Sequence, residues 1–142
     1  MPENRIDRVF TELKSKNRRA LIPFLTAGDP DLETSGRLVE ELIARGADVV
    51  EIGIPYSDPI ADGPVISASY TRALAKHIHL DQIFEMIGRL RAGGVVAPLV
   101  TMVSHAIVHR RGPARYVEDA ARAGVDGLII PDLPIEEAGE IE

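Results

Sequence analysis

The sequence contains no cysteine and no tryptophan, and only three phenylalanines and three tyrosines among its 142 residues. The absence of cysteine excludes disulfides, thiolate nucleophiles and thiolate metal ligands. Because aromatic residues make up 4% of the chain and hydrophobic residues 45%, a folded core has to be built from aliphatic side chains. The composition is that of an ordinary globular protein.

Long apolar runs and an excess of positive charge are also missing. No segment approaches the ~20 apolar residues of a membrane span, and residues 1–8 lack the apolar stretch of a signal peptide. The chain has 16 basic and 22 acidic residues, a net charge of −6, and so no electrostatic footprint for nucleic acid or an anionic membrane. We expect a cytoplasmic protein that binds neither.

Short apolar runs alternate with apolar residues at helical spacing. An amphipathic helix is expected first, over residues 6–13. The runs that predict buried strands and the spacings that predict helices then follow in turn: strands at 20–25, 49–54, 97–103 and 127–130, and helices at 32–43, 80–90 and 116–121 and from about 135, with Pro64 suited to a first helical turn. This alternation predicts an α/β fold with parallel strands covered by helices.

The number of strand-helix units leaves two architectures open. Four units fit a small open α/β sheet, and they equally fit half of a (β/α)₈ barrel, which typically needs ~250 residues. No linker is visible, so we expect residues 1–142 to form a single domain.

Glu51 interrupts an otherwise apolar strand. Strand alternation places Glu51 and Gly53 on one face and Ile52 on the other. An ionised carboxylate without partners in such a strand costs several kcal/mol, so it is rarely there for packing. The pattern leaves two interpretations open, a functional carboxylate or a strand-end glutamate that reaches solvent or pairs with an arginine.

Further acidic residues follow the strands. Asp62 lies in the loop after the second strand, at the edge where α/β folds gather catalytic groups. Two carboxylates in one cleft could divide acid and base roles if their environments separate their pKa values. Asp58 precedes a proline and suits a turn. Asp132 ends the fourth strand and is expected to line the same cleft.

Other patterns point less clearly to chemistry. Ser104 and His105 are adjacent, and on the strand expected there they would point to opposite faces. His77 and His79 lack a third ligand at suitable spacing, so no metal site is expected. No Walker A sequence and no G-x-G-x-x-G motif is present, which leaves nucleotide binding without a positive signal.

Three segments resemble one known family. Residues 21–30 (LIPFLTAGDP), 51–64 (EIGIPYSDPIADGP) and 131–137 (PDLPIEE) closely resemble signatures of the tryptophan synthase alpha subunit. The resemblance implies a (β/α)₈ barrel, of which this chain would hold about the first four βα units and an N-terminal helix. It also implies a lyase of tryptophan biosynthesis, which cleaves indole-3-glycerol phosphate by a retro-aldol reaction to indole and glyceraldehyde 3-phosphate.

The resemblance implies roles for individual residues. Glu51 would be the general acid/base that protonates the indole ring carbon and accepts the proton of the side-chain hydroxyl. Asp62 would hydrogen-bond the indole N–H and stabilise the positive charge that develops on the ring. Phe24 would belong to the indole pocket.

The substrate wall and the partner surface are expected from the same resemblance. Many family members carry an aromatic side chain at the position of Ser104, so Met102 or His105 is expected to take its place here, and Met102 and Asp132 are expected to line the substrate. Asp58 and Pro59 would face a beta subunit in an alpha₂beta₂ assembly. Pyridoxal phosphate is expected only in that beta subunit, and no metal or organic cofactor in this chain.

The family holds its substrate phosphate with loops of the second half of the barrel. We therefore expect the 142 residues alone to have little or no lyase activity. The alternative is a non-catalytic half-barrel binding module that pairs with itself or with a beta subunit, because open sheet edges invite pairing.

Overall fold

The computed structural model describes residues 4–141. The strands are β1 (Phe24–Thr26), β2 (Val50–Gly53), β3 (Leu99–Met102) and β4 (Gly127–Ile129). The helices are α1 (Arg5–Ser15), α2 (Leu32–Ala44), α3 (Pro64–Leu74), α4 (Leu80–Ala92), α5 (His105–Arg111), α6 (Pro113–Ala123) and the 3-10 helix η1 (Ile135–Glu140). No helix within the described residues is long and apolar enough to cross a membrane.

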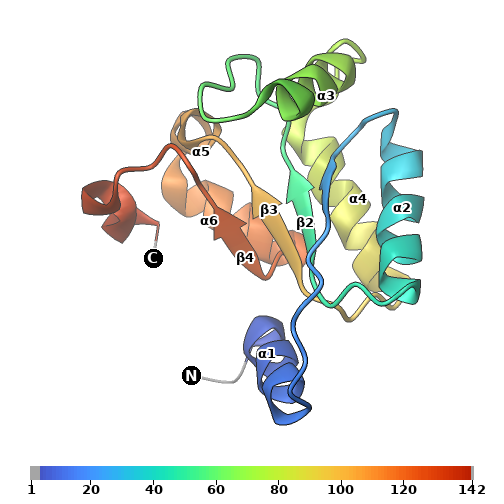
Figure 1. The fold of residues 1–142 in the computed structure, drawn as a ribbon. Coiled ribbons are helices and arrows are strands. Elements are labelled where there is room, and N and C mark those ends of the chain that lie inside the picture. The colour runs from blue at the N-terminus through green and yellow to red at the C-terminus, as the bar shows by residue number, and fades with distance from the viewer. Residues whose placement is uncertain (1–3, 142) are drawn as a thin grey trace.

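The strands form one parallel sheet in the order β1-β2-β3-β4, so each lies beside its predecessor in the chain. Helices α2, α4 and α6 pack side by side over one face (Figure 1). A doubly wound sheet reverses its strand order and has helices on both faces, whereas a (β/α)₈ barrel adds strands sequentially with its helices outside. The topology is that of the first four βα units of a barrel, and the small open sheet is excluded.

The helix-covered face of the sheet contains the hydrophobic core. Val50, Ile52 and Leu99 are each 0% exposed, because alternation along the strands points them at the helix layer. Ile83 and Ile87 of α4 pack into the same cluster. Each such aliphatic side chain contributes about 1.5–3 kcal/mol by leaving water, which fixes the helix layer against the sheet.

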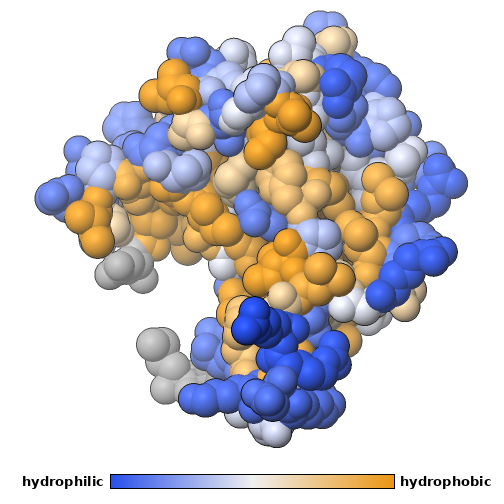
Figure 2. All heavy atoms as spheres, in the orientation of Figure 1, coloured by the Kyte–Doolittle hydropathy of each residue, from blue (hydrophilic) through white to orange (hydrophobic). Residues whose placement is uncertain are grey.

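Within residues 4–141, no helix lies across the opposite face of the sheet. Figure 2 shows hydrophobic side chains gathered on this face, and a hollow between η1 and α1. Two rows of residues in register share the face: Phe24, Glu51, Val100 and Gly127, then Thr26, Gly53, Met102 and Ile129. This is the face that points into the centre of a barrel, with α3 and α5 at the carboxyl ends of its strands (Figure 1).

Most expected elements are confirmed, with two differences. The first strand is shorter than residues 20–25, since Pro23 has no N–H to donate and regular pairing begins at Phe24. The expectation of a strand at Ser104 and His105 is wrong, because these residues begin α5. Ser104 is its N-cap, and its hydroxyl accepts the backbone N–H of Ala106.

Candidate active site

Glu51 lies at the centre of the uncovered face. It stands beside Phe24 of β1 and Val100 of β3, and its side chain is half-buried. Burial raises the pKa of the Glu51 carboxyl above its ordinary value. A carboxyl whose pKa rises toward neutrality can both give and take a proton, which is the property needed for acid–base chemistry.

Gly53, two residues further along β2, leaves room that a side chain would fill. A Cβ at this position would lie 2.5 Å from Cζ of Phe24 and 3.0 Å from the hydroxyl oxygen of Tyr70. Two aromatic side chains therefore meet over the glycine, just beyond Glu51. The close approach explains why the strand carries a glycine here.

Asp62 lies in the loop between β2 and α3 and is half-buried. Burial raises the pKa of its carboxyl, and the negative charge of Asp132 raises it further. Both candidate carboxylates have raised pKa values, and the effect of a neighbouring carboxylate is specific to Asp62.

Asp132 connects the ends of β4 and β3. Its carboxylate accepts a hydrogen bond from the Ser104 hydroxyl at 2.7 Å and from the backbone N–H of His105 at 2.8 Å. Burial acts to raise the pKa of Asp132, but these two hydrogen bonds outweigh it and the pKa falls below its ordinary value. Asp132 thus remains ionised beside Asp62.

The loop after β2 folds back over the ends of β3 and β4. It encloses a small cavity of about 20 Å³, whose wall includes Asp62, Tyr70, Met102, Ser104 and Asp132. Of the sequence-predicted residues, Asp62, Met102 and Asp132 therefore line one cavity, and Phe24 and Glu51 lie beside each other on the adjoining sheet face. Asp58 is exposed and Pro59 half-buried in the same loop.

Tyr70 is a member of this cluster that the sequence analysis did not identify. It lies on α3, eight positions after Asp62, and is 3% exposed. Its spacing of three residues from the buried Ala73 is typical of a helix face that packs against the core. Only the three-dimensional path of the loop shows that its hydroxyl reaches the space above Gly53.

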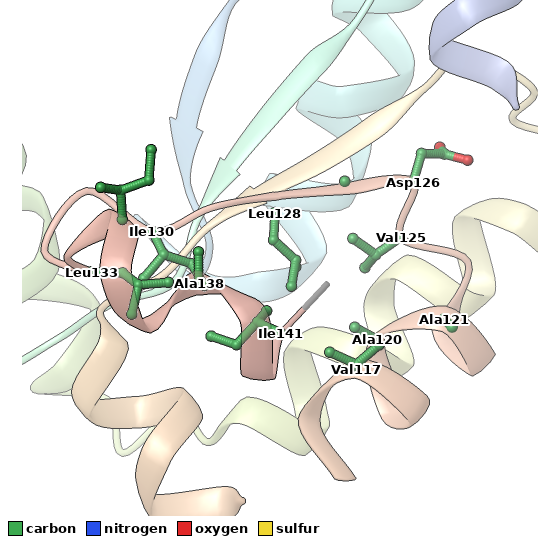
Figure 3. Close-up of a pocket in the computed structure, with 12 residues that line it drawn as sticks. Val117, Ala120, Ala121, Val125, Asp126, Leu128, Ile130, Leu133, Ala138 and Ile141 are labelled. Carbon is green, nitrogen blue, oxygen red and sulfur yellow. The ribbon is translucent and has the colours of Figure 1, made fainter. Parts of the chain in front are cut away.

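A larger groove lies away from the carboxylates. Its volume is about 580 Å³, and it runs between α6, the outer side of β4 and η1 (Figure 3). Its lining is almost entirely aliphatic, with Val117, Leu128 and Ile141 among the side chains that face it. Since Asp126 is the one ionisable group in its lining, we do not assign the chemistry to this groove. Among the described residues no cluster of three His, Asp or Glu side chains could hold a metal ion.

The raised pKa of Glu51 has a consequence for stability. Burial disfavours the charged form only in the folded state, so ionisation weakens folding as pH rises above the ordinary glutamate value of 4.5. We expect Glu51→Gln to increase the free energy of unfolding of the 142-residue chain at about pH 7, and the gain to vanish at about pH 4. Urea unfolding at both pH values measures this.

Glu85→Gln, on the exposed side of α4, is the matched control. It should leave the free energy of unfolding unchanged at both pH values. If Glu51→Gln left the stability at neutral pH unchanged, the assigned burial of the Glu51 carboxylate would be wrong.

Comparison with known sequences identifies similar proteins. Residues 10–142 match the family model described as Tryptophan synthase alpha chain. The tryptophan synthase alpha chain of Caldanaerobacter subterraneus is 51% identical over 138 residues, covering 97% of this chain and 52% of that relative. The one from Clostridium kluyveri is 49% identical with the same coverage, 97% and 52%. The chain spans about half the length of the curated relatives it matches.

Solved structures agree with the sequence comparisons. Tryptophan synthase subunit alpha from Legionella pneumophila superposes with a TM-score of 0.94 at 40% identity, covering 97% of this chain and 53% of that one. A chain of the tryptophan synthase a2b2 complex from Pyrococcus furiosus superposes with a TM-score of 0.81 at 38% identity, covering 86% and 48%.

Proposed function

The chain belongs to the tryptophan synthase alpha chain family, and on this basis we propose that it contributes the acid–base residues of a lyase that cleaves indole-3-glycerol phosphate. The observation that supports this most directly is the half-buried Glu51, with its raised pKa, on the uncovered sheet face. The products would be indole and glyceraldehyde 3-phosphate, as the family resemblance implies.

Glu51 is proposed to move both protons of the retro-aldol step. A proton is delivered to the indole ring carbon that carries the side chain, and the proton of the adjacent side-chain hydroxyl is removed. The carbon–carbon bond between them then breaks, its electron pair remains on the indole, and the hydroxyl carbon becomes the aldehyde. Since one proton is added and one is lost, the reaction needs no oxidant or reductant, and one carboxyl can serve in both directions.

The Asp62 carboxylate is proposed to accept a hydrogen bond from the indole N–H. Positive charge develops on this nitrogen when the ring carbon is protonated. A carboxylate at that point stabilises the transition state more than the ground state, which is the requirement for catalysis. Phe24, Met102 and Asp132 are proposed to bind the substrate around it. Their position at the same end of the sheet supports this assignment.

We propose further that this step needs no metal or organic cofactor and that the protein is cytoplasmic. A pyridoxal phosphate-dependent beta subunit is the proposed partner in an alpha₂beta₂ assembly. Asp58 and Pro59 are proposed to contact it, which their place at the rim of the site supports.

A second candidate is a binding module formed by a half-barrel. The uncovered sheet face and the edge strands β1 and β4 favour it, since unpaired strand edges template association. Size-exclusion chromatography of the 142-residue chain shows whether it forms a dimer or stays a monomer. A stable dimer without lyase activity in any context would favour the binding module over the enzyme.

The enzyme proposal is tested with a chimaera, made of residues 1–142 followed by the part of the Caldanaerobacter subterraneus chain beyond the matched region. We expect the chimaera to release indole from indole-3-glycerol phosphate. The 142 residues alone, which we propose to be a single domain on the strength of their continuous core, should release little or none. Equal rates for the two proteins would contradict the expectation that both barrel halves are needed.

A further inference from the structure

Tyr70 extends from α3 over the carboxyl end of β2. Its side chain is almost fully buried, at 3% exposed, yet its hydroxyl oxygen lies only 3.0 Å from the position a Cβ would take on Gly53. The same side chain lines the small cavity that Asp62 and Asp132 share. Tyr70 therefore belongs both to the packing of α3 and to the site.

No side-chain hydrogen bond within residues 4–141 involves the Tyr70 hydroxyl, and its oxygen is not among the fully enclosed unpaired atoms of that part of the chain, which are Thr101 Oγ1 and the Tyr116 hydroxyl. Burial raises the pKa of this phenol, and the negative charges of Asp62 and Glu51 raise it further. The phenol consequently keeps its proton throughout the working pH range. A protonated phenol without a side-chain partner in the protein, lying within the field of two carboxylates, is suited to donate a hydrogen bond to a ligand in the adjoining space.

The chemistry of the proposed substrate limits what this hydroxyl could bind. The indole nitrogen is a donor only, and Asp62 is the group assigned to it. The atoms near Glu51 that accept a hydrogen bond are the hydroxyl oxygens of the glycerol chain. A protonated phenol beside both carboxylates is thus matched to the glycerol chain and not to the indole nitrogen.

The ring of Tyr70 has a separate role. The Phe24 atoms Cζ and Cε2 lie 2.5 Å and 2.8 Å from the position that a Cβ would take on Gly53. The Tyr70 hydroxyl approaches the same position. The two aromatic side chains therefore close one end of the site together. Aromatic rings favour stacked or edge contacts with another planar ring, such as an indole.

We propose that Tyr70 is a substrate-binding residue, whose ring forms a wall of the indole pocket beside Phe24 and whose hydroxyl donates a hydrogen bond to the glycerol chain of the substrate. This inference rests on the proposed function for the identity of the substrate. The proposal adds a residue of α3 to the site. Tyr70 lies outside the three sequence segments that carry the family resemblance.

NMR titration of the 142-residue chain tests the proposal with two probes, indole and indole-3-glycerol phosphate. Because the chain has three tyrosines and no tryptophan, ring-labelled tyrosine gives three protein signals without indole background. We expect both probes to shift the Tyr70 ring signal. Tyr116 lies fully buried against the helix layer, so its signal should not move.

Two variants separate the ring from the hydroxyl. Tyr70→Phe keeps the ring, so indole should bind as before while indole-3-glycerol phosphate binds about three- to tenfold more weakly, the usual effect of one lost hydrogen bond. Tyr70→Leu should weaken the binding of both probes. Tyr116→Phe removes a tyrosine hydroxyl that is fully buried and unpaired within the described residues, and it should weaken the binding of neither probe.

The proposal is overturned if neither probe shifts the Tyr70 ring, or if Tyr70→Phe binds indole-3-glycerol phosphate as tightly as the unmodified chain. Turnover by the chimaera is a separate readout. A chimaera that releases indole while the Tyr70 variants bind normally would leave the proposed function standing and remove only this inference.

Discussion

Glu51→Gln in the chimaera is expected to lower kcat for indole release by roughly 10²- to 10⁴-fold, the range found when a general acid–base group is removed. Glutamine has nearly the same shape as glutamate but cannot donate or accept the protons that the retro-aldol step requires. The side chain lies in register with Phe24 and Val100 on a strand, so the substitution should leave the backbone in place. The affinity for indole-3-glycerol phosphate should change little.

Steady-state kinetics of indole release, together with a direct binding measurement, separates these two quantities. Glu85→Gln on the exposed side of α4 serves as the control and should retain full turnover. A Glu51→Gln chimaera with kcat within a few-fold of the unmodified chimaera would remove Glu51 from its assigned role. Loss of binding and turnover together would instead assign Glu51 to substrate recognition.

The second large effect concerns stability at the opposite end of the sheet. Asp126 precedes β4, with its side chain only 6% exposed. Its carboxylate pairs with Arg91 and with Arg5 and accepts the backbone N–H of Leu99 at 2.9 Å. Arg91 in turn donates to the carbonyl oxygen of Gly124 at 2.9 Å. One carboxylate thus joins α1, α4, β3 and β4.

Asp126→Ala is expected to lower the free energy of unfolding of the 142-residue chain by about 3–5 kcal/mol, because Arg91 would be left buried without a counter-charge. This is a large part of the ~5–15 kcal/mol that stabilises a typical domain. Urea unfolding measures the change. Glu41→Ala removes the exposed partner of Arg45 and should have little or no effect.

A loss for Asp126→Ala no greater than that for Glu41→Ala would show that the cluster is not a structural clamp. The contrast between the two ends of the sheet is physically reasonable. The Asp126 carboxylate at the amino ends of the strands is paired and holds elements together, whereas Glu51 on the uncovered face and Asp62 in the loop after β2 have raised pKa values and no ion-pair partner within the described residues.

Periodicity was sufficient to predict the sheet. The two-residue alternation around Glu51 correctly separated the core side chain Ile52 from the uncovered face, because only one face of each strand meets the helix layer. Gly124 ends α6, and its φ of +92° suits a residue without a side chain. The alternation of strands and helices predicted that the strands are parallel, but it did not predict the order in which they lie in the sheet.

Local patterns failed where a long-range contact decides the conformation. Ser104 follows an apolar strand and gave no sign of a helix, yet its hydroxyl bonds to Asp132, 28 positions later, while α5 begins beside it. Tyr70 was hidden for a similar reason, because its place above Gly53 depends on how α3 folds back over β2. The sequence pointed to Glu51, Asp62 and Asp132, but not to Tyr70 or to the hydrogen bond between Ser104 and Asp132.

Indole release from indole-3-glycerol phosphate by the chimaera, measured beside a chimaera with both Glu51→Gln and Asp62→Asn, tests the central claim most directly. The claim is that residues 1–142 supply the two catalytic carboxylates. It predicts sustained indole release by the first protein and none above background by the second, with both proteins folded. Indole release by the doubly substituted chimaera at a rate comparable to the first would contradict it.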